Sequence, residues 1–214
     1  MNEIDLKHVL PFNEFDYPTL CNALKSYANI RAKIQRFLNT GSVIRVKKGL
    51  YVLGKKLTHG PISLEILANL IYGPSYISLD YALSFYHLIP ERVYEVTSIT
   101  LKRFKKFQTP LGTFSYRSLS KKLYPLGVQW VAIDEKRSVL MATSEKALID
   151  SLYFSGIRDF HSKAEIESWL FEDKRLDLEA LTNLDKTTLQ NFRSYYSHRA
   201  ILALIAYLTG EKDE

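Results

Sequence analysis

The sequence has few of the residues that several classes of functional site require. It contains one cysteine, Cys21, so it cannot form an internal disulfide or a zinc site built from several cysteines. Its nine glycines lack the spacing of phosphate-binding loops, and its five histidines stand singly, outside the spacing that zinc ligands need. We therefore expect no metal site and no cofactor, and we expect Cys21 to be a small buried hydrophobic residue.

Long apolar runs are also absent from the sequence. The longest, at residues 201–208, has about eight residues, whereas a helix needs roughly 20 to cross a bilayer. The first five residues lack the basic segment with which a signal peptide begins. We expect a cytoplasmic protein without membrane association, and 214 residues are enough for one or two compact domains.

Acidic side chains are missing from two long stretches of the chain. The net charge is +6, and residues 1–57 hold ten basic and four acidic side chains, whereas residues 58–214 hold 19 of each. No acid occurs between Asp16 and Glu65, and none occurs in residues 96–133. This distribution concentrates positive potential along parts of the chain, which favours a polyanionic partner.

The first 57 residues predict three helices. The first is expected near residues 4–10. Asp16 is a suitable N-cap for the second helix, because its carboxylate can accept a hydrogen bond from a free amide of the first turn. Asn29 can cap the third helix in the same way, and Gly41 marks its end.

Segments 43–46 and 50–53 predict a β-hairpin whose turn contains Gly49. Three helices followed by a two-stranded ribbon with a basic tip is the order of a winged helix-turn-helix domain. In that architecture the third helix lies in the major groove of double-stranded DNA, and the ribbon contacts adjacent backbone or minor groove. The side chains expected to contact DNA are Asn29, Arg31, Lys33, Gln35, Arg36, Arg45, Lys47 and Lys48. The alternatives are that these cations only solvate the surface, or that the domain binds another protein.

A second, larger domain is expected after residue 57, which divides the chain into 1–57 and 58–214. Helices are predicted after Pro61 and from Ser78 to Leu88. Strands are predicted at 96–101, 113–116, 128–133 and 138–142, and helices from 144 to the end of the chain. The predicted fold class is α+β, with an N-terminal winged helix-turn-helix domain, a mixed α+β domain and a helical C-terminal end.

The second acid-free stretch is a candidate for additional contacts with the DNA backbone. Its first four cations flank the end of one predicted strand, and the other three follow the next strand. A two-stranded ribbon would bring both groups to one side of the domain. The residues are Lys102, Arg103, Lys105, Lys106, Arg117, Lys121 and Lys122. The alternative is a pair of solvated loops that face away from the DNA.

No arrangement of residues predicts catalysis, and we expect the protein not to be an enzyme. Asp80 and His87 are seven residues apart on one predicted helix, and the segment 172–174 matches only a fragment of a nuclease site. Lys146 and Asp150 have i, i+4 spacing. We expect them to form an ion pair on a helix surface, which stabilises a helix by about 0.2–0.5 kcal/mol.

Several blocks of the sequence resemble a known family. They are residues 30–41 with 43–52, residues 75–83 with 86–91, and residues 143–150. Over nearly its whole length the chain is similar to the AbiEi-type antitoxins, which are winged-helix regulators of type IV toxin–antitoxin systems. The first block occurs in many regulators, whereas the later ones are more specific to this family. The resemblance implies that the protein represses its own operon and counteracts a nucleotidyltransferase-like toxin encoded beside it, without requiring a stable complex.

Two other functions stay open from the sequence. One is a winged-helix transcriptional regulator whose C-terminal domain senses a small molecule. The other is an enzyme with a DNA-binding appendage. Neither the operator sequence nor the oligomeric state follows from the residues.

Overall fold

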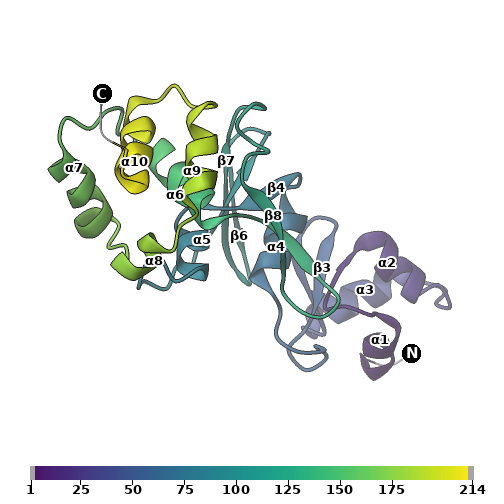
Figure 1. Ribbon diagram of the computed structural model, residues 1–214. Coiled ribbons are helices and arrows are strands. Elements are labelled where there is room, and N and C mark those ends of the chain that lie inside the picture. Colours follow the sequence, from purple (N-terminus) through teal and green to yellow (C-terminus); the bar gives the residue numbers. More distant parts are fainter. Residues whose placement is uncertain (1–2, 212–214) are drawn as a thin grey trace.

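The computed structural model describes residues 3–211 and contains two β-sheets with helices around them (Figure 1). The predicted α+β class is confirmed. The N-terminal helices lie at one end of the molecule, the last helices of the chain lie at the other, and the larger sheet lies between them (Figure 1).

Residues 3–57 form what we call the N-terminal unit. Its first helix, α1, spans Glu3–Val9, and α2 spans Tyr17–Ala23. The N-cap of α2 is Asp16, whose carboxylate accepts a hydrogen bond from the Thr19 amide at 2.8 Å. The predicted cap is therefore confirmed, and the hydrogen bond satisfies one of the amides that a helix leaves free at its start.

Helix α3 spans Ile30–Asn39. It begins after Asn29, whose Oδ1 accepts a hydrogen bond from the Ala32 amide at 3.0 Å. Gly41 follows the helix with a φ of +71°, which glycine adopts at low cost. Both predicted boundaries of this helix are confirmed.

The smaller sheet has the strand order β1-β3-β2, with every pair antiparallel. Strands β2 (Val43–Lys47) and β3 (Leu50–Leu53) are the predicted hairpin, and Gly49 in its turn has a φ of +87°. Strand β1 (Glu14–Asp16) was not predicted. Three residues are too short to show an alternating pattern, and pairing with β3 is what makes them a strand.

The hairpin contributes to two hydrophobic cores because successive side chains of a strand point to opposite faces. One set packs with the helices of the N-terminal unit: Val43, Tyr51 and Leu53. The other set packs with the core of the larger sheet: Val46, Leu50 and Val52. Each of these apolar side chains stabilises the packing by roughly 1.5–3 kcal/mol when it is fully buried. The boundary near residue 58 stays a prediction, since the hairpin joins both cores.

The larger sheet has six strands in the order β6-β7-β5-β4-β9-β8. The β5–β7 and β4–β9 pairs are parallel, and the other pairs are antiparallel. The four predicted strands are confirmed as β5 (Val96–Thr100), β7 (Gly112–Ser118), β8 (Val128–Ala132) and β9 (Ser138–Ala142). Two strands were not predicted, the short β4 (Ser75–Ile77) and the largely exposed edge strand β6 (Lys105–Thr109).

Helices cover both faces of this sheet. On one face lies α4 (Leu64–Ile71), where the Tyr116 hydroxyl of β7 donates a hydrogen bond to the Ala68 carbonyl at 2.7 Å. On the other face lie α5 (Leu79–Phe85) and α6 (Ser144–Tyr153). We call these the α4 face and the α6 face. Figure 1 shows α4 between the sheet and the N-terminal unit.

Ser78 occupies the N-cap position of α5, but its side chain does not cap the helix. Its hydroxyl donates instead to Oδ2 of Asp150 at 2.8 Å. The helix ends at Phe85, so the predicted extension to Leu88 is wrong. Sequence spacing could not reveal that Asp150, 72 residues away, competes for this hydroxyl.

The C-terminal end is helical, as predicted. After the N-cap Ser162, α7 continues directly into a short π-helical segment, η1, and three further helices follow. The elements are α7 (Lys163–Ser168), η1 (Trp169–Asp173), α8 (Leu178–Thr182), α9 (Lys186–Arg193) and α10 (Arg199–Thr209). Their apolar side chains join the core of the larger sheet.

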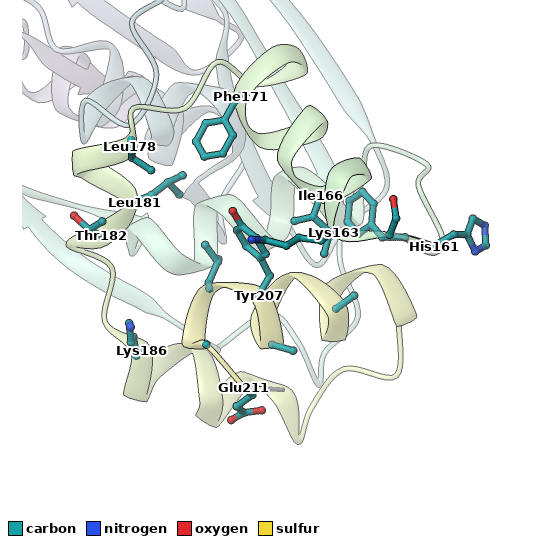
Figure 2. Close-up of a pocket in the computed structure, with 16 residues that line it drawn as sticks. His161, Lys163, Ile166, Phe171, Leu178, Leu181, Thr182, Lys186, Tyr207 and Glu211 are labelled. Atoms are coloured by element: carbon teal, nitrogen blue, oxygen red, sulfur yellow. The ribbon is translucent and has the colours of Figure 1, made fainter. Parts of the chain in front are cut away.

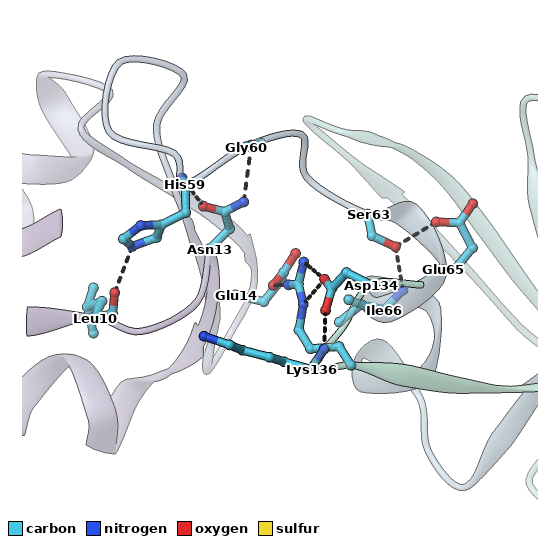
Figure 3. A network of polar contacts seen from close by, with 11 residues as sticks. Leu10, Asn13, Glu14, His59, Gly60, Ser63, Glu65, Ile66, Asp134 and Lys136 are labelled. Carbon is cyan, nitrogen blue, oxygen red and sulfur yellow. Dashed lines mark hydrogen bonds and ion pairs between the residues drawn. The ribbon is translucent and has the colours of Figure 1, made fainter. Parts of the chain in front are cut away.

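Polar contacts connect the N-terminal unit to the rest of the chain (Figure 3). The Asn13 side chain donates to the Gly60 carbonyl at 3.2 Å and accepts from the His59 amide at 2.8 Å. Arg137, between β8 and β9, lies 2.5 Å from the carboxylate of Glu14 in β1. Burial raises the pKa of Glu14, and the positive charge of Arg137 opposes that shift. The Asn13 bonds thus hold the segment that follows β3, and the Glu14–Arg137 pair holds β1 against the β8–β9 turn.

Candidate nucleic-acid interface

Helix α3 buries one side and exposes the other. Ile34 and Phe37 are buried against the core of the N-terminal unit. The exposed residues from its N-cap onward include Asn29, Arg31, Gln35 and Arg36, all of which the sequence placed in the contact set. An exposed helix face with two arginines and two amides has the donors and acceptors that base edges and phosphates bind.

Besides Asn29, whose Oδ1 caps the helix, two further side chains of this set have partners within the helix region. Lys33 is half-buried, and its Nζ lies 4.9 Å from the ring centroids of both Tyr27 and Phe37. Gln35 donates from Nε2 to Oδ1 of Asn39 at 2.9 Å. Lys33 is therefore held close to the helix by cation–π contacts, whereas Gln35 is exposed beside Arg36.

The tip of the hairpin presents Lys47 and Lys48 in different environments. Lys48 and Arg45 are exposed. Lys47 is half-buried, and its Nζ donates to the carbonyl of Ile71, the last residue of α4, at 2.6 Å. Burial lowers the pKa of Lys47, and the charges of Lys102 and Lys105 lower it further. Lys47 thus fastens the hairpin to α4, and Lys48 is the freer of the two amines.

Two cations from the second acid-free stretch lie over the ring of Tyr72 and within electrostatic reach of Lys47. The Nζ atoms of Lys102 and Lys105 lie 5.1 and 5.7 Å from its centroid. Lys102 also donates to the Gly73 carbonyl. The C-terminal end of α4 carries partial negative charge, which stabilises amines at this position. We call Lys47, Lys102, Lys105 and Tyr72 the Tyr72 cluster.

The second acid-free stretch is divided between the two faces of the sheet. Lys105 pairs with Tyr116 across β6 and β7, which places it on the α4 face. Arg117 is the next residue along β7, and its guanidinium lies 5.4 Å from the ring centroid of Phe154 at the end of α6. The expectation that both groups lie on one side is therefore wrong for Arg117, because strand alternation sends it to the α6 face.

The other cations of that stretch do not belong to the Tyr72 cluster. Lys106 forms an ion pair with Glu95 at 2.6 Å. Arg103, Lys121 and Lys122 are exposed. Only Lys102 and Lys105 are shown to lie close to the hairpin tip.

The structure contains a buried polar network that the sequence pattern did not predict. Lys146 and Asp150 of α6 are fully buried, with Nζ 2.6 Å from Oδ1, so the expected surface ion pair is wrong. Asp150 also accepts hydrogen bonds from the hydroxyls of Tyr76 and Ser78, and Lys146 donates to the Tyr196 hydroxyl at 2.8 Å. Burial raises the pKa of Asp150, and the adjacent Lys146 opposes this shift. The only hint in the sequence is that apolar residues surround the pair on α6.

Two of the residues considered for catalysis, Asp80 and Lys174, lie together as an ion pair, whereas no contact joins Asp80 to His87 among the described residues. Asp80 is bonded to Lys174 at 2.8 Å, and His87 lies beyond the end of α5 with a φ of +59°. Glu172 accepts a hydrogen bond from Ser168. Within the described residues, no group of three or more His, Cys, Asp or Glu side chains could hold a metal ion.

A cavity of about 610 Å³, lined by apolar side chains together with charged ones, opens among the C-terminal helical elements α7, η1, α8, α9 and α10 (Figure 2). Ile166, Phe171, Leu181 and Tyr207 contribute to its lining, and Lys163 lies with its Nζ 5.6 Å from the Tyr207 ring centroid. A cavity of this size and character suits a small organic ligand. Nothing in the sequence indicated it, because its walls come from several helical elements, α7, η1, α8, α9 and α10, brought together by folding.

Comparisons with known proteins do not assign the chain: no family model matches it, and no curated protein matches it. Among residues 3–211, no helix has both the length and the apolar character needed to cross a membrane.

Proposed function

We propose that the N-terminal unit is a winged helix-turn-helix domain and that the protein binds double-stranded DNA through it. The observation that carries the proposal is the exposed side of α3, where Arg31, Gln35 and Arg36 follow the capped N-terminus at Asn29. The order of elements in this unit also supports the proposal, since a helix and a strand are followed by two helices and a hairpin. In this arrangement α3 is the recognition helix.

Charge supports the same assignment. No acidic residue occurs between Asp16 and Glu65, so α3 and the hairpin share a surface without carboxylates of their own. The Tyr72 cluster adds Lys102 and Lys105 next to the hairpin tip. These amines extend the positive surface from the hairpin onto the larger sheet, where they neutralise phosphates beside the recognition helix.

The biological role that fits this surface is an antitoxin that represses its own operon. The resemblance of residues 30–41 with 43–52, 75–83 with 86–91, and 143–150 to the AbiEi-type antitoxins supports it. In this proposal the DNA partner is the operator of that operon, and the target is a nucleotidyltransferase-like toxin, counteracted without a stable complex.

Operator recognition is tested by binding-site selection from random duplexes. Arg36→Ala is expected to relax the selected sequence, because an arginine that binds guanine with two hydrogen bonds contributes roughly 1–3 kcal/mol of discrimination. Arg193→Ala is the matched control, since Arg193 is also an exposed arginine in the last turn of a helix, α9, outside the proposed interface. An unchanged selected sequence for Arg36→Ala would exclude α3 as the reading helix.

The antitoxin role is tested in cells that express the toxin encoded by the neighbouring reading frame. Growth should be restored by the full chain. Comparing the chain with its Arg36→Ala variant separates repression from neutralisation, because only repression requires operator binding. Failure of the full chain to protect would exclude the antitoxin role and leave DNA binding to be judged separately.

A second candidate function is a transcriptional regulator that senses a small molecule. The cavity between α7, α8 and α10 favours it (Figure 2). This function requires operator affinity to change when a ligand fills that cavity. A ligand that binds there without changing operator affinity would exclude it.

A further inference from the structure

A polar hollow lies on the C-terminal part of the molecule, where the loop after β7 meets the segment between α9 and α10. It has a volume of about 390 Å³, and its lining includes Lys122, Tyr195 and Tyr196. A second hollow of about 510 Å³ includes Arg158 and Arg199 in its lining. The two adjoin, because Tyr153, Ser197 and His198 line both.

The charge of the combined hollow has one sign. Lys122, Arg158 and Arg199 contribute cations, and no aspartate or glutamate lines either part. Arg199 lies 3.5 Å from Asp159, but Lys122 and Arg158 form no ion pair with any carboxylate of residues 6–211. Two unpaired cations at the edge of a hollow without carboxylates attract an anion.

Aromatic side chains form the rest of the wall. Tyr196 is buried, and its hydroxyl accepts a hydrogen bond from Nζ of Lys146 at 2.8 Å, which holds its ring in place. The Tyr153 ring packs against Tyr196 and His198, with centroid separations of 6.4 and 6.0 Å. Tyr195 also lines the hollow and is 43% exposed, so part of its side chain is accessible to a ligand.

We propose that this hollow binds a nucleoside monophosphate or a closely related phosphorylated small molecule. Lys122 and Arg158 bind the phosphate, the hydroxyl of Ser197 adds a neutral donor, and the base stacks on Tyr195. Arginine and lysine form strong charge-assisted hydrogen bonds with phosphate oxygens, and bases stack on tyrosine rings with little dependence on their identity. The volumes are within the range of small-molecule sites, roughly 300–1,000 Å³. The site is separate from the proposed DNA-binding surface and does not depend on it.

The test is a calorimetric titration of the full-length protein with adenosine monophosphate, uridine monophosphate, inorganic phosphate and adenosine. Both nucleotides should bind, phosphate should bind more weakly, and adenosine should show no measurable binding. Lys122→Ala and Arg158→Ala should each weaken nucleotide binding at least tenfold. Tyr195→Ala should weaken nucleotide binding and leave phosphate binding unchanged.

Lys121→Ala is the matched control, because Lys121 is the exposed neighbour of Lys122 and does not line the hollow. It should leave nucleotide binding unchanged. Equal losses for Lys121→Ala and Lys122→Ala would show that net charge alone attracts the ligand, and this would overturn the proposal. Absence of nucleotide binding, or equal binding of adenosine and adenosine monophosphate, would also overturn it.

A final comparison separates a free nucleotide from the backbone of a nucleic acid. Duplex DNA is titrated against the full-length protein and its Lys122→Ala variant at the same ionic strength. Unchanged duplex affinity together with weakened nucleotide binding supports the proposed site. If Lys122→Ala lowered duplex affinity and the wild type did not bind nucleotide, Lys122 would be a contact to the DNA backbone, and the proposal would be overturned.

Discussion

The amine of Lys146 lies 2.6 Å from the carboxylate of Asp150, and neither side chain is exposed to solvent. Hydroxyl groups of Tyr76, Ser78 and Tyr196 complete the hydrogen bonds of the pair. Gly127 covers it closely, since a Cβ at that position would lie 2.8 Å from Cβ of Lys146. The pair therefore links β4, α6 and the segment before α10 into one packed unit.

Replacing Lys146 with methionine is expected to destabilise the protein by about 3–5 kcal/mol, because Asp150 then stays buried without an opposite charge. The double variant Lys146→Met, Asp150→Leu should recover most of this loss, since it removes both charges. The free energy of unfolding in urea measures both effects.

Lys163→Met is the control for that comparison. Lys163 and Glu167 have the same i, i+4 spacing, but their side chains are 73% and 40% exposed. The change should cost no more than about 0.5 kcal/mol, because water screens an exposed pair. If Lys146→Met lowered the free energy of unfolding as little as Lys163→Met does, burial would not be what makes the Lys146–Asp150 pair important for stability.

The hairpin tip should contribute to DNA affinity through Lys48. Lys48→Ala is expected to weaken binding to all sequences about equally and to reduce the slope of log affinity against log salt by about 0.9, the contribution of one phosphate contact. Fluorescence titrations at several salt concentrations measure the slope. Lys186→Ala, at an exposed position on α9, should leave it unchanged. An unaltered slope for Lys48→Ala would show that the hairpin tip does not contact the DNA backbone.

The Tyr72 cluster should extend the DNA footprint. The double variant Lys102→Ala, Lys105→Ala in the full-length chain is expected to lower operator affinity, with a loss that shrinks as salt rises. The double variant Lys106→Ala, Lys121→Ala removes the same charge outside the cluster and should change affinity much less. Equal losses in the two proteins would show that net charge, not position, is responsible.

Glu14 should make stability depend on pH in a defined direction. Burial raises its pKa in the folded state above the ordinary value of 4.5, so the folded protein holds this proton more tightly than the unfolded chain. The wild type should therefore gain stability relative to Glu14→Gln as pH falls from neutral through the raised pKa towards 4.5. Other carboxyl groups titrate in both proteins, so urea unfolding of the two at each pH isolates Glu14. A relative loss of wild-type stability in acid would show that the ion pair with Arg137 outweighs burial.

Local features of the fold could be predicted from the sequence because they depend on residues close together in the chain. Asp16 and Asn29 cap their helices through bonds to amides three residues away. Gly49 supplies the positive φ of the hairpin turn. A run rich in β-branched residues marked β5 and a short apolar run marked β9, whereas β1 and β4 have three residues each and became recognisable only through their partners.

Part of the candidate DNA-binding surface could also be predicted, because it too depends on residues close together in the chain. The exposed side of α3 follows from helical periodicity, so Arg31 and Arg36 could be assigned to it. The bond from Lys47 to the Ile71 carbonyl joins residues 24 positions apart, and the cavity in Figure 2 is built from several helical elements between α7 and α10. Neither has a local signal that spacing could reveal.

The sequence by itself determined where helices begin, where the hairpin turns and which stretches lack acids, since each depends on neighbouring residues. Only the tertiary structure decided that Lys105 and Arg117 lie on opposite faces of one sheet, because this requires the register of β6 against β7. It likewise decided that Lys146 and Asp150 are buried. Their i, i+4 spacing is that of a surface pair, and only the packing of β4 and the segment before α10 onto α6 removes them from water.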